Sequence, residues 1–471
     1  SSRTSPWLNI ATFIVETIQC GVAEDRDTPL GMSLFRQLVK SIATQFHPST
    51  KVYFSMGGQF IRDVSITFAN RVGITLAERK TSCYENSDFV EDSGSGYRRG
   101  FEQLDKVKTD FVALVLPLVL NALYHRSHHY AESAMQTLSA LVQLDPQAVQ
   151  AKLLPQVYRA LDPEKSLSHA HQAVPALRAL TYTFWHLSKR NLPQIAPHFH
   201  DIVSLTMPGI DSNDGMKTLH ALNFFAMFFV CIPLIDCSGD DWTWDRKRAD
   251  ENTRYKDEDW LRVKSTSAFF EEFAVEFLNH LLRYAAKTGK ENGQVDGGLG
   301  DDSGKASASD NYGVLGVSGN LCIRFFFCNM SPKIRKTVVV ELAKQILSMS
   351  NEMTMVYKLL CKYAGRYEPK LFLELLIPTI TVRVFKNHAE FGESGVTNAI
   401  KGVFDDDMGN TSLLWYLKIL DATCKHCGPA CLQYSTFYVQ ILRVTFHHDS
   451  EKVRMAGNQL FRSLLNNLTS S

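Results

Sequence analysis

The sequence predicts an all-α fold, a curved α-solenoid in which antiparallel helix pairs stack one after another. Helical periodicity dominates the chain, and strand-like alternation is confined to two short pieces, KVYFSMGGQFI (51–61) and LCIRFFF (321–327). The chain has 471 residues, which is too long for one compact core. A leucine–proline opening also recurs along it at a regular spacing. Together these observations favour a repeat array.

Apolar residues at three- and four-residue spacing mark the expected helices from one end of the chain to the other. Polar, proline or glycine breaks separate them. The clearest segments are residues 7–19, 34–46, 135–144, 269–286, 338–349, 371–385, 413–424, 435–446 and 456–468. Helices of this length with short breaks between them are expected to pair with their neighbours in antiparallel fashion.

The repeat is clearest in the segments VLPLVLNALYH, LLPQVYRALDP and NLPQIAPHFHD, whose prolines are Pro117, Pro155 and Pro193. These prolines recur about every 40 residues, which is the period of HEAT repeats. Pro233 continues the spacing, and LLIPTI at Pro378 resembles a later copy. Because a proline loses no hydrogen bond in the first turn of a helix, we expect these prolines near helix starts. Chance recurrence is the alternative, but the similar residues around them favour a HEAT-like solenoid.

The predicted organisation has two solenoid parts, residues 1–285 and 313–471. Residues 286–312 are rich in Gly, Ser and Asp, which predicts a disordered insertion between them. Residues 82–100 resemble a shorter loop of the same kind. Residues 236–260 are acidic and contain tryptophans. They predict either a docking loop for a basic partner or a solvated loop pinned by its tryptophans.

The composition and the chain ends give little support for nucleic-acid binding, membrane binding or secretion. The net charge of +1 gives no general attraction to nucleic acid or to an anionic membrane. The first residues do not form a signal peptide. The ten cysteines are spread along the chain, many of them in apolar runs, as is typical of reduced intracellular proteins. The final residues, LLNNLTSS, suggest a chain cut between helices, and hence a fragment of a longer protein.

The most apolar stretch is residues 207–237, MPGIDSNDGMKTLHALNFFAMFFVCIPLIDC. Its uncharged core, residues 221–235, is too short to span a membrane. We expect a helix capped by Asp211 or Ser212 and ended by Pro233. Because its phenylalanines lie on more than one face, this helix should be buried, with the rings serving for packing and not for ligand binding.

A possible metal site is CKHCGPAC, which contains Cys424, Cys427 and Cys431. Cys-x2-Cys is half of a zinc signature, but the second half is missing. The break at Gly428 and Pro429 favours buried structural cysteines at a turn between helices. We therefore predict that no metal is bound; if one were, these three cysteines would be the candidate ligands.

A possible anion site is MSPKIRKTVVVELAKQ, residues 330–345. Ser331 can cap a helix here, and Lys333, Arg335 and Lys336 follow in its first turns. Cations oppose the dipole at a helix start, and a bound anion would offset that cost. Solvent-facing basic residues on the solenoid rim are the alternative. The sequence has no P-loop, nucleotide-binding fingerprint or nucleophile elbow, so we predict no enzyme and no catalytic residues.

Residues 208–238 resemble the giant single-chain HEAT-repeat proteasome activators. Their middle region carries a Pro-Gly-Ile-Asp-x-Asn-Asp-x-x-Lys-Thr pattern, then a phenylalanine-rich helix and Pro-Leu-x-Asp-Cys-Ser. The matching positions here are Pro208, Gly209, Ile210, Asp211, Asn213, Asp214, Lys217, Thr218, Phe225, Pro233, Leu234, Asp236, Cys237 and Ser238. The specific resemblance covers about 80 residues, and departs at Ser212, often proline in the family, and Gly215, often aromatic.

The resemblance implies that the chain is a middle arc of a larger dome that caps the α-ring of the core proteasome. Such activators work without ATP or ubiquitin and regulate the entry of peptides or unfolded proteins. The resemblance also implies acetylated histones as substrates, a link to DNA repair, and a location in the nucleus and cytoplasm. Inositol phosphate is the one cofactor implied, in the parent protein; direct nucleic-acid or membrane binding is not expected. The family's C-terminal docking tail is absent from LTSS.

A generic HEAT-repeat adaptor, of the nuclear-transport or trafficking type, is the alternative function. Such a protein would share the helix repeats but not the pattern at residues 208–238.

Overall fold

A computed structural model describes residues 6–23, 30–50, 56–85, 94–235, 267–293, 305–349, 353–385 and 407–469. It divides into two compact units, Ser1–Thr206 and Met207–Ser471. The described residues of both units are helical, as the sequence predicts, and their only β-type pairing is one isolated bridge between Leu234 and Met330.

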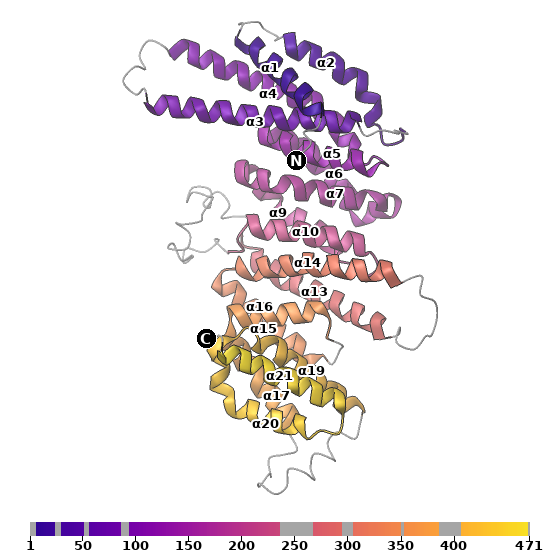
Figure 1. The fold of residues 1–471 in the computed structure, drawn as a ribbon, viewed down its shortest axis with the longest axis vertical. Coiled ribbons are helices and arrows are strands. Elements are labelled where there is room, and N and C mark those ends of the chain that lie inside the picture. Colours follow the sequence, from indigo (N-terminus) through magenta and orange to yellow (C-terminus); the bar gives the residue numbers. More distant parts are fainter. Residues whose placement is uncertain are drawn as a thin grey trace. The chain divides into compact units, whose positions relative to one another are not determined.

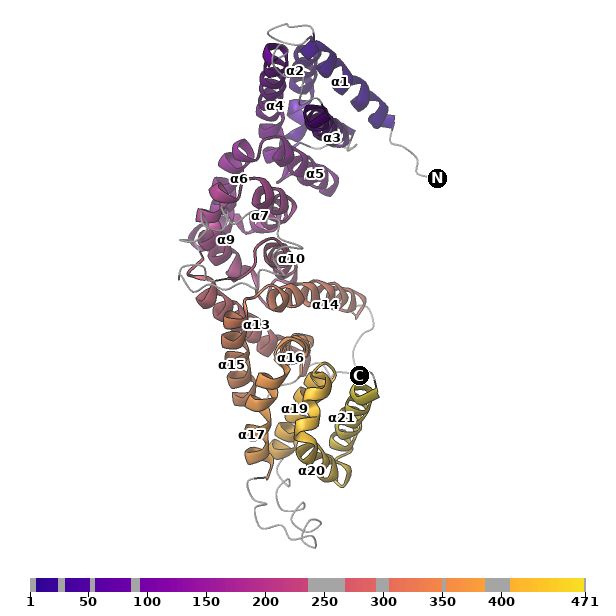
Figure 2. The same ribbon diagram turned by 90° about the vertical axis from the view of Figure 1, so that its left-hand side faces the viewer.

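The first unit is a stack of helices in two layers (Figures 1 and 2). One layer contains α1, α3, α5 and α7, each in contact with the next, and the other contains α2, α4, α6 and α9. This alternation is that of a HEAT-like solenoid, in which each helix pair buries its apolar faces against its neighbours. The helices are α1 (Pro6–Ala23), α2 (Leu30–Ile42), α3 (Met56–Glu85), α4 (Gly94–Ala122), α5 (His128–Leu144), α6 (Pro146–Leu161), α7 (Pro163–Arg190), α8 (Leu192–Ile195) and α9 (Phe199–Thr206), with 3₁₀ turns η1 (Ala43–Phe46) and η2 (Ala196–His198).

The second unit repeats the two-layer arrangement. Helices α10, α14, α16, α19 and α21 contact one another in succession, and α13, α15 and α17 form the other layer, which η6 links to α20. Figure 2 shows α16, α19 and α21 side by side. The elements are η3 (Met207–Gly209), α10 (Gly215–Cys231), α13 (Phe270–Gly293), α14 (Lys305–Cys328), α15 (Pro332–Ser348), α16 (Met355–Tyr367), α17 (Pro369–Phe385), α19 (Asp407–Cys424), η6 (Gly428–Tyr434), α20 (Ser435–Phe446) and α21 (Glu451–Thr469).

The repeat prolines are not all at helix starts. Pro193 lies in the first turn of α8, but Pro117 and Pro155 lie inside α4 and α6. Helix α6 starts earlier because Asp145 caps it, its side-chain oxygen accepting a 3.0 Å hydrogen bond from the Ala148 amide. The prediction of first-turn prolines was therefore wrong for two of the three, because α4 and α6 both begin upstream of their prolines.

Two predicted loops are shorter than expected. Helix α3 continues to Glu85 and α4 begins at Gly94, so both ends of the predicted loop 82–100 are helical. Likewise α13 reaches Gly293 and α14 begins at Lys305, inside the predicted insertion 286–312. Once a packed segment has nucleated a helix, each further residue adds a hydrogen bond at little cost, even in a polar sequence. The remainders of both segments, and all of 236–260, lie outside the described residues.

Candidate functional site

The loop that leads into α10 is a compact hydrogen-bonded turn. The buried Thr218 hydroxyl donates to the Asp211 carbonyl oxygen at 2.6 Å, and its oxygen accepts from the Asp211 amide at 2.9 Å. The Asp211 carboxylate accepts from the Asn213 amide at 3.0 Å. Asp214, and neither Asp211 nor Ser212, caps the helix by accepting from the Lys217 amide at 2.9 Å. The predicted cap was wrong because the carboxylate of Asp211 is used within the turn.

The other residues of the pattern at 208–238 differ in their exposure. Gly209 is buried at the end of η3, whereas Pro208 is exposed. Gly215 is the first residue of α10, and an added Cβ there would meet open space. The departure from the family's aromatic residue is therefore limited to one terminal position of the helix. Asp236 and Cys237 lie outside the described residues.

The phenylalanines of α10 are core residues, as predicted. Phe225 and Phe229 pack against Phe277 of α13, with ring centroids 4.9 and 5.1 Å apart. Phe326 of α14 lies 5.1 Å from Phe229 and 4.9 Å from Phe277. All four rings are fully buried, and burying each one stabilises the fold by about 1.5–3 kcal/mol. This cluster joins three helices and leaves no space for a ligand among those rings.

The end of α10 is tied to the turn between α14 and α15. The helix stops at Cys231, two residues before Pro233, as predicted. The Leu234 amide donates to the Asn329 carbonyl at 2.8 Å, and the Ser331 amide donates to the Leu234 carbonyl at 2.9 Å. Residues 208–234 therefore include both ends of the buried helix α10. They also anchor it to a segment about one hundred residues later in the chain.

The three predicted anion-binding residues do not form a common free site. Ser331 caps α15 as predicted, accepting from the Ile334 amide. Arg335 donates to the Met330 carbonyl at 2.9 Å and lies 3.9 Å from the Glu368 carboxylate. Lys333 lies 3.4 Å from the Glu271 carboxylate, and Lys336 is exposed. A carboxylate therefore lies beside two of the three cations.

Cys424, Cys427 and Cys431 are buried at the junction between α19 and η6, so the predicted break between helices is confirmed. The Cys424 thiol lies 3.0 Å from the Tyr438 hydroxyl. Donation from the Cys424 and Cys427 thiols lowers the pKa of Cys431. The pKa of Cys427 is raised, mainly because its thiol donates a hydrogen bond to Cys431 and secondly because the thiol is buried. Across the described residues, no group of three or more His, Cys, Asp or Glu side chains is placed to hold a metal ion.

A groove of about 590 Å³, which the sequence did not reveal, lies across α16, α19 and α21. We call it the basic groove. Five cationic side chains and one carboxylate line it: Lys358, Lys362, Lys418, Lys425, Arg462 and Asp421. Its apolar part comes from Met353, Met355, Leu359 and Ala422. Lys358 and Lys362, four residues apart on α16, are a sequence signal for a common face of that helix. Only the packing brings α16, α19 and α21 together.

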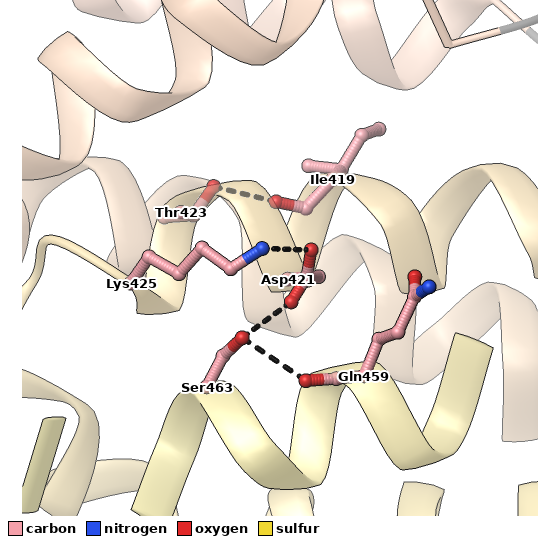
Figure 3. A network of polar contacts seen from close by, with 6 residues as sticks. All are labelled: Ile419, Asp421, Thr423, Lys425, Gln459 and Ser463. Atoms are coloured by element: carbon pink, nitrogen blue, oxygen red, sulfur yellow. Dashed lines mark hydrogen bonds and ion pairs between the residues drawn. The ribbon is translucent and has the colours of Figure 1, made fainter. Parts of the chain in front are cut away.

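One polar network fixes the position of the groove's carboxylate. Figure 3 shows Lys425, which directly follows the end of α19, reaching back to Asp421, with the two charged atoms 2.8 Å apart. The Ser463 hydroxyl of α21 lies 2.5 Å from the other Asp421 oxygen and 3.0 Å from the Gln459 carbonyl. The carboxylate therefore links α19 to α21 and neutralises one of the five cations.

The remaining charge makes the groove electropositive. Burial lowers the pKa of His426, and Lys362, Arg366 and Lys425 lower it further. After burial, these positive neighbours are the further cause that disfavours the protonated imidazole, in agreement with the excess of cations that line the groove. The groove can thus attract anionic groups.

No helix in the described residues is long and apolar enough to cross a membrane, in agreement with the interpretation of α10.

Comparison with known proteins identifies the family. The family model for the mid HEAT-repeat region of proteasome activator complex subunit 4 matches residues 35–471. The chain is 24% identical to proteasome activator complex subunit 4B of Danio rerio over 72% of its length, and 23% identical to subunit 4 of Xenopus laevis over 78%. It is 22% identical to subunit 4 of Homo sapiens over 78% of its length.

The matches cover only a part of each relative. They span 17% of the Danio rerio protein, 19% of the Xenopus laevis protein and 18% of the human protein. The family model, in contrast, covers most of this chain, and its HEAT repeats agree with the two-layer stacks of helices. The chain therefore belongs to the proteasome activator complex subunit 4 family and corresponds to the family's mid HEAT-repeat region.

Proposed function

We propose that this chain is a wall segment of an activator that caps the α-ring of the core proteasome and regulates substrate entry without ATP or ubiquitin. The family match over residues 35–471 carries this proposal. A stack of helix pairs with a continuous buried core is suited to the role, because a solenoid is a curved wall whose surfaces can enclose a space. The contribution of this segment is then access and scaffolding, with no catalytic step.

The test uses the natural full-length protein that carries this sequence, mixed with purified core proteasome. We expect the two to co-purify and the hydrolysis of a fluorogenic peptide to increase when the activator is added. The increase should persist after ATP is removed with apyrase and in the absence of ubiquitin. Failure to associate, together with unchanged hydrolysis, would reject the proposal.

Dependence on the wall can be tested in the same assay. Phe229→Ala removes a fully buried ring from the core of the second unit, whereas Phe461 is 41% exposed on α21. If the intact wall regulates entry, Phe229→Ala should reduce stimulation at temperatures where Phe461→Ala does not. Equal stimulation by both variants, after the first has been shown to unfold, would argue against a role for this segment.

A further inference from the structure

We propose that the basic groove is a docking site for an acidic polypeptide segment that also carries apolar side chains. The proposal goes beyond proteasome activation and does not depend on it, because it concerns what the groove binds and not what the assembly does. It rests on three properties of the groove: its charge, its apolar surface and its position across three helices.

The charge of the groove determines the sign of the charge that its partner must carry. Lys358, Lys418 and Arg462 lie on α16, α19 and α21, and none of them has a carboxylate partner among the described residues. Lys425 is paired with Asp421, so the groove keeps a net positive charge. Unpaired cations favour an anionic partner. Because these cations lie on three different helices, they suit a chain that carries several carboxylates along its length.

The apolar surface distinguishes the partner from a small anion. Met353 and Met355 lie where the chain enters α16, and Met355 is 54% exposed. Leu359 and Ala422 complete the apolar part. Phosphate groups gain nothing from such a surface, whereas a peptide can bury a leucine or phenylalanine there, and exposed methionines adapt to varied side chains.

A polar side chain on α21 suits a peptide backbone. Gln459 lines the groove there, and an amide side chain can both donate and accept hydrogen bonds. A nucleic acid is less suited, because single strands usually stack their bases on aromatic side chains. Within the described residues, no Phe, Tyr or Trp lines the groove. The combination of cations, methionines and the Gln459 amide therefore favours an acidic, partly apolar polypeptide.

The test measures binding of a fluorescein-labelled peptide of alternating glutamate and leucine to the natural full-length protein, by fluorescence anisotropy. The groove variant is Lys358→Glu, Lys418→Glu and Arg462→Glu combined. The matched control reverses two lysines and one arginine that are exposed outside the groove, Lys370→Glu, Lys452→Glu and Arg443→Glu. Both variants change the net charge equally, and circular dichroism melting checks that both remain folded.

We expect the groove variant to weaken peptide binding at least about tenfold, since each lost cation–carboxylate contact is replaced by repulsion, while the control changes little. Binding should also weaken as salt is added. Replacing the glutamates of the peptide by glutamine should abolish binding, and replacing its leucines by serine should weaken it.

Four results would overturn the proposal. The groove variant could bind the peptide as well as the parent, or both variants could lose affinity equally, which would show a general charge effect. The serine peptide could bind as tightly as the leucine peptide, which would leave the apolar surface without a role. Finally, tripolyphosphate or a single-stranded RNA could bind the groove while the peptide does not. None of these measurements needs the proteasome, so their outcome is distinct from that of the activation assay.

Discussion

The side-chain amide of Asn329 donates a 2.7 Å hydrogen bond to the main-chain carbonyl of Phe229, one hundred positions earlier in the chain. In an α-helix that carbonyl would accept from the residue four positions on, which here is Pro233 and has no N–H. Asn329 therefore supplies the donor that the helix-ending proline cannot, and it joins the end of α10 to the turn before α15.

We expect Asn329→Ala to lower the free energy of unfolding by about 1–3 kcal/mol, because it leaves a carbonyl near the helix end without its partner. Urea unfolding followed by circular dichroism measures the change. Asn458→Ala is the matched control, since Asn458 is exposed on α21, and it should change stability by less than about 0.5 kcal/mol. Equal effects of the two substitutions would contradict the role assigned to Asn329.

Phe229→Ala should lower the free energy of unfolding by about 3–5 kcal/mol, because the lost ring leaves a cavity between α10, α13 and α14. Guanidinium unfolding of the purified protein checks this. Phe461→Ala removes a partly exposed ring and should cost clearly less. A small effect at Phe229 would mean that the ring does not belong to the core.

Acidification should destabilise the protein in part through His448. Burial lowers the pKa of His448, with Asp449 opposing and Arg454 adding to the shift. Its Nδ1 accepts from the Ser450 amide at 3.0 Å, which requires the neutral ring. Between this lowered pKa and the unfolded value of about 6.5, the unfolded state binds more protons, so stability falls as the pH drops through that window.

The substitution His448→Asn tests this contribution, because an asparagine oxygen can also accept from the Ser450 amide but does not titrate. The variant should lose less stability than the parent between about pH 7 and pH 5, measured by thermal melting across that range. Identical pH profiles for the two proteins would assign the acid sensitivity to other groups.

The cations of α15 should differ in their roles. Arg335 donates to Met330 and lies over the Tyr367 ring at 5.5 Å, so Arg335→Ala should destabilise the protein by about 1–3 kcal/mol. Lys333 is 71% exposed, and its pairing with Glu271 contributes at most about 1 kcal/mol. The double variant Lys333→Glu and Lys336→Glu should therefore remain as stable as the parent to within about 1 kcal/mol.

The same double variant tests anion binding at this helix start. Because Arg335 is engaged in the fold and Glu271 lies beside Lys333, we expect the affinity for inositol hexakisphosphate to be unchanged, as measured by isothermal titration calorimetry. A clear loss of affinity in the double variant would instead support the site that the sequence suggests.

Local chemistry made the α10 region largely predictable. The length of the apolar run and the position of Pro233 were enough to predict a buried helix with a defined end, and the rings of Phe225 and Phe229 pack as expected. The cap was assigned to the wrong residue because Asp211, Ser212 and Asp214 all carry side chains that can cap. Which of the three residues caps the helix depends on Thr218, which lies in the first turn and forms a hydrogen bond with Asp211.

The basic groove could not be predicted in the same way. Lys358, Lys418 and Arg462 are separated by tens of residues, and each alone resembles an ordinary solvent-facing cation of an amphipathic helix. The sequence instead pointed to Lys333, Arg335 and Lys336, which lie within four consecutive residues. Proximity in sequence is a poor guide to a shared site in a solenoid, because facing side chains come from successive repeats.

The sequence by itself determined the class of the fold, the period of the repeat and the position of the buried phenylalanine helix, because periodicity, prolines and apolar length act within one segment. The family resemblance also came from contiguous residues. Only the tertiary structure decided which cations remain available: Arg335 turns toward Met330, whereas Lys358, Lys418 and Arg462 line one groove. Pairing between charges depends on which helices pack together, and that packing depends on contacts between distant parts of the chain.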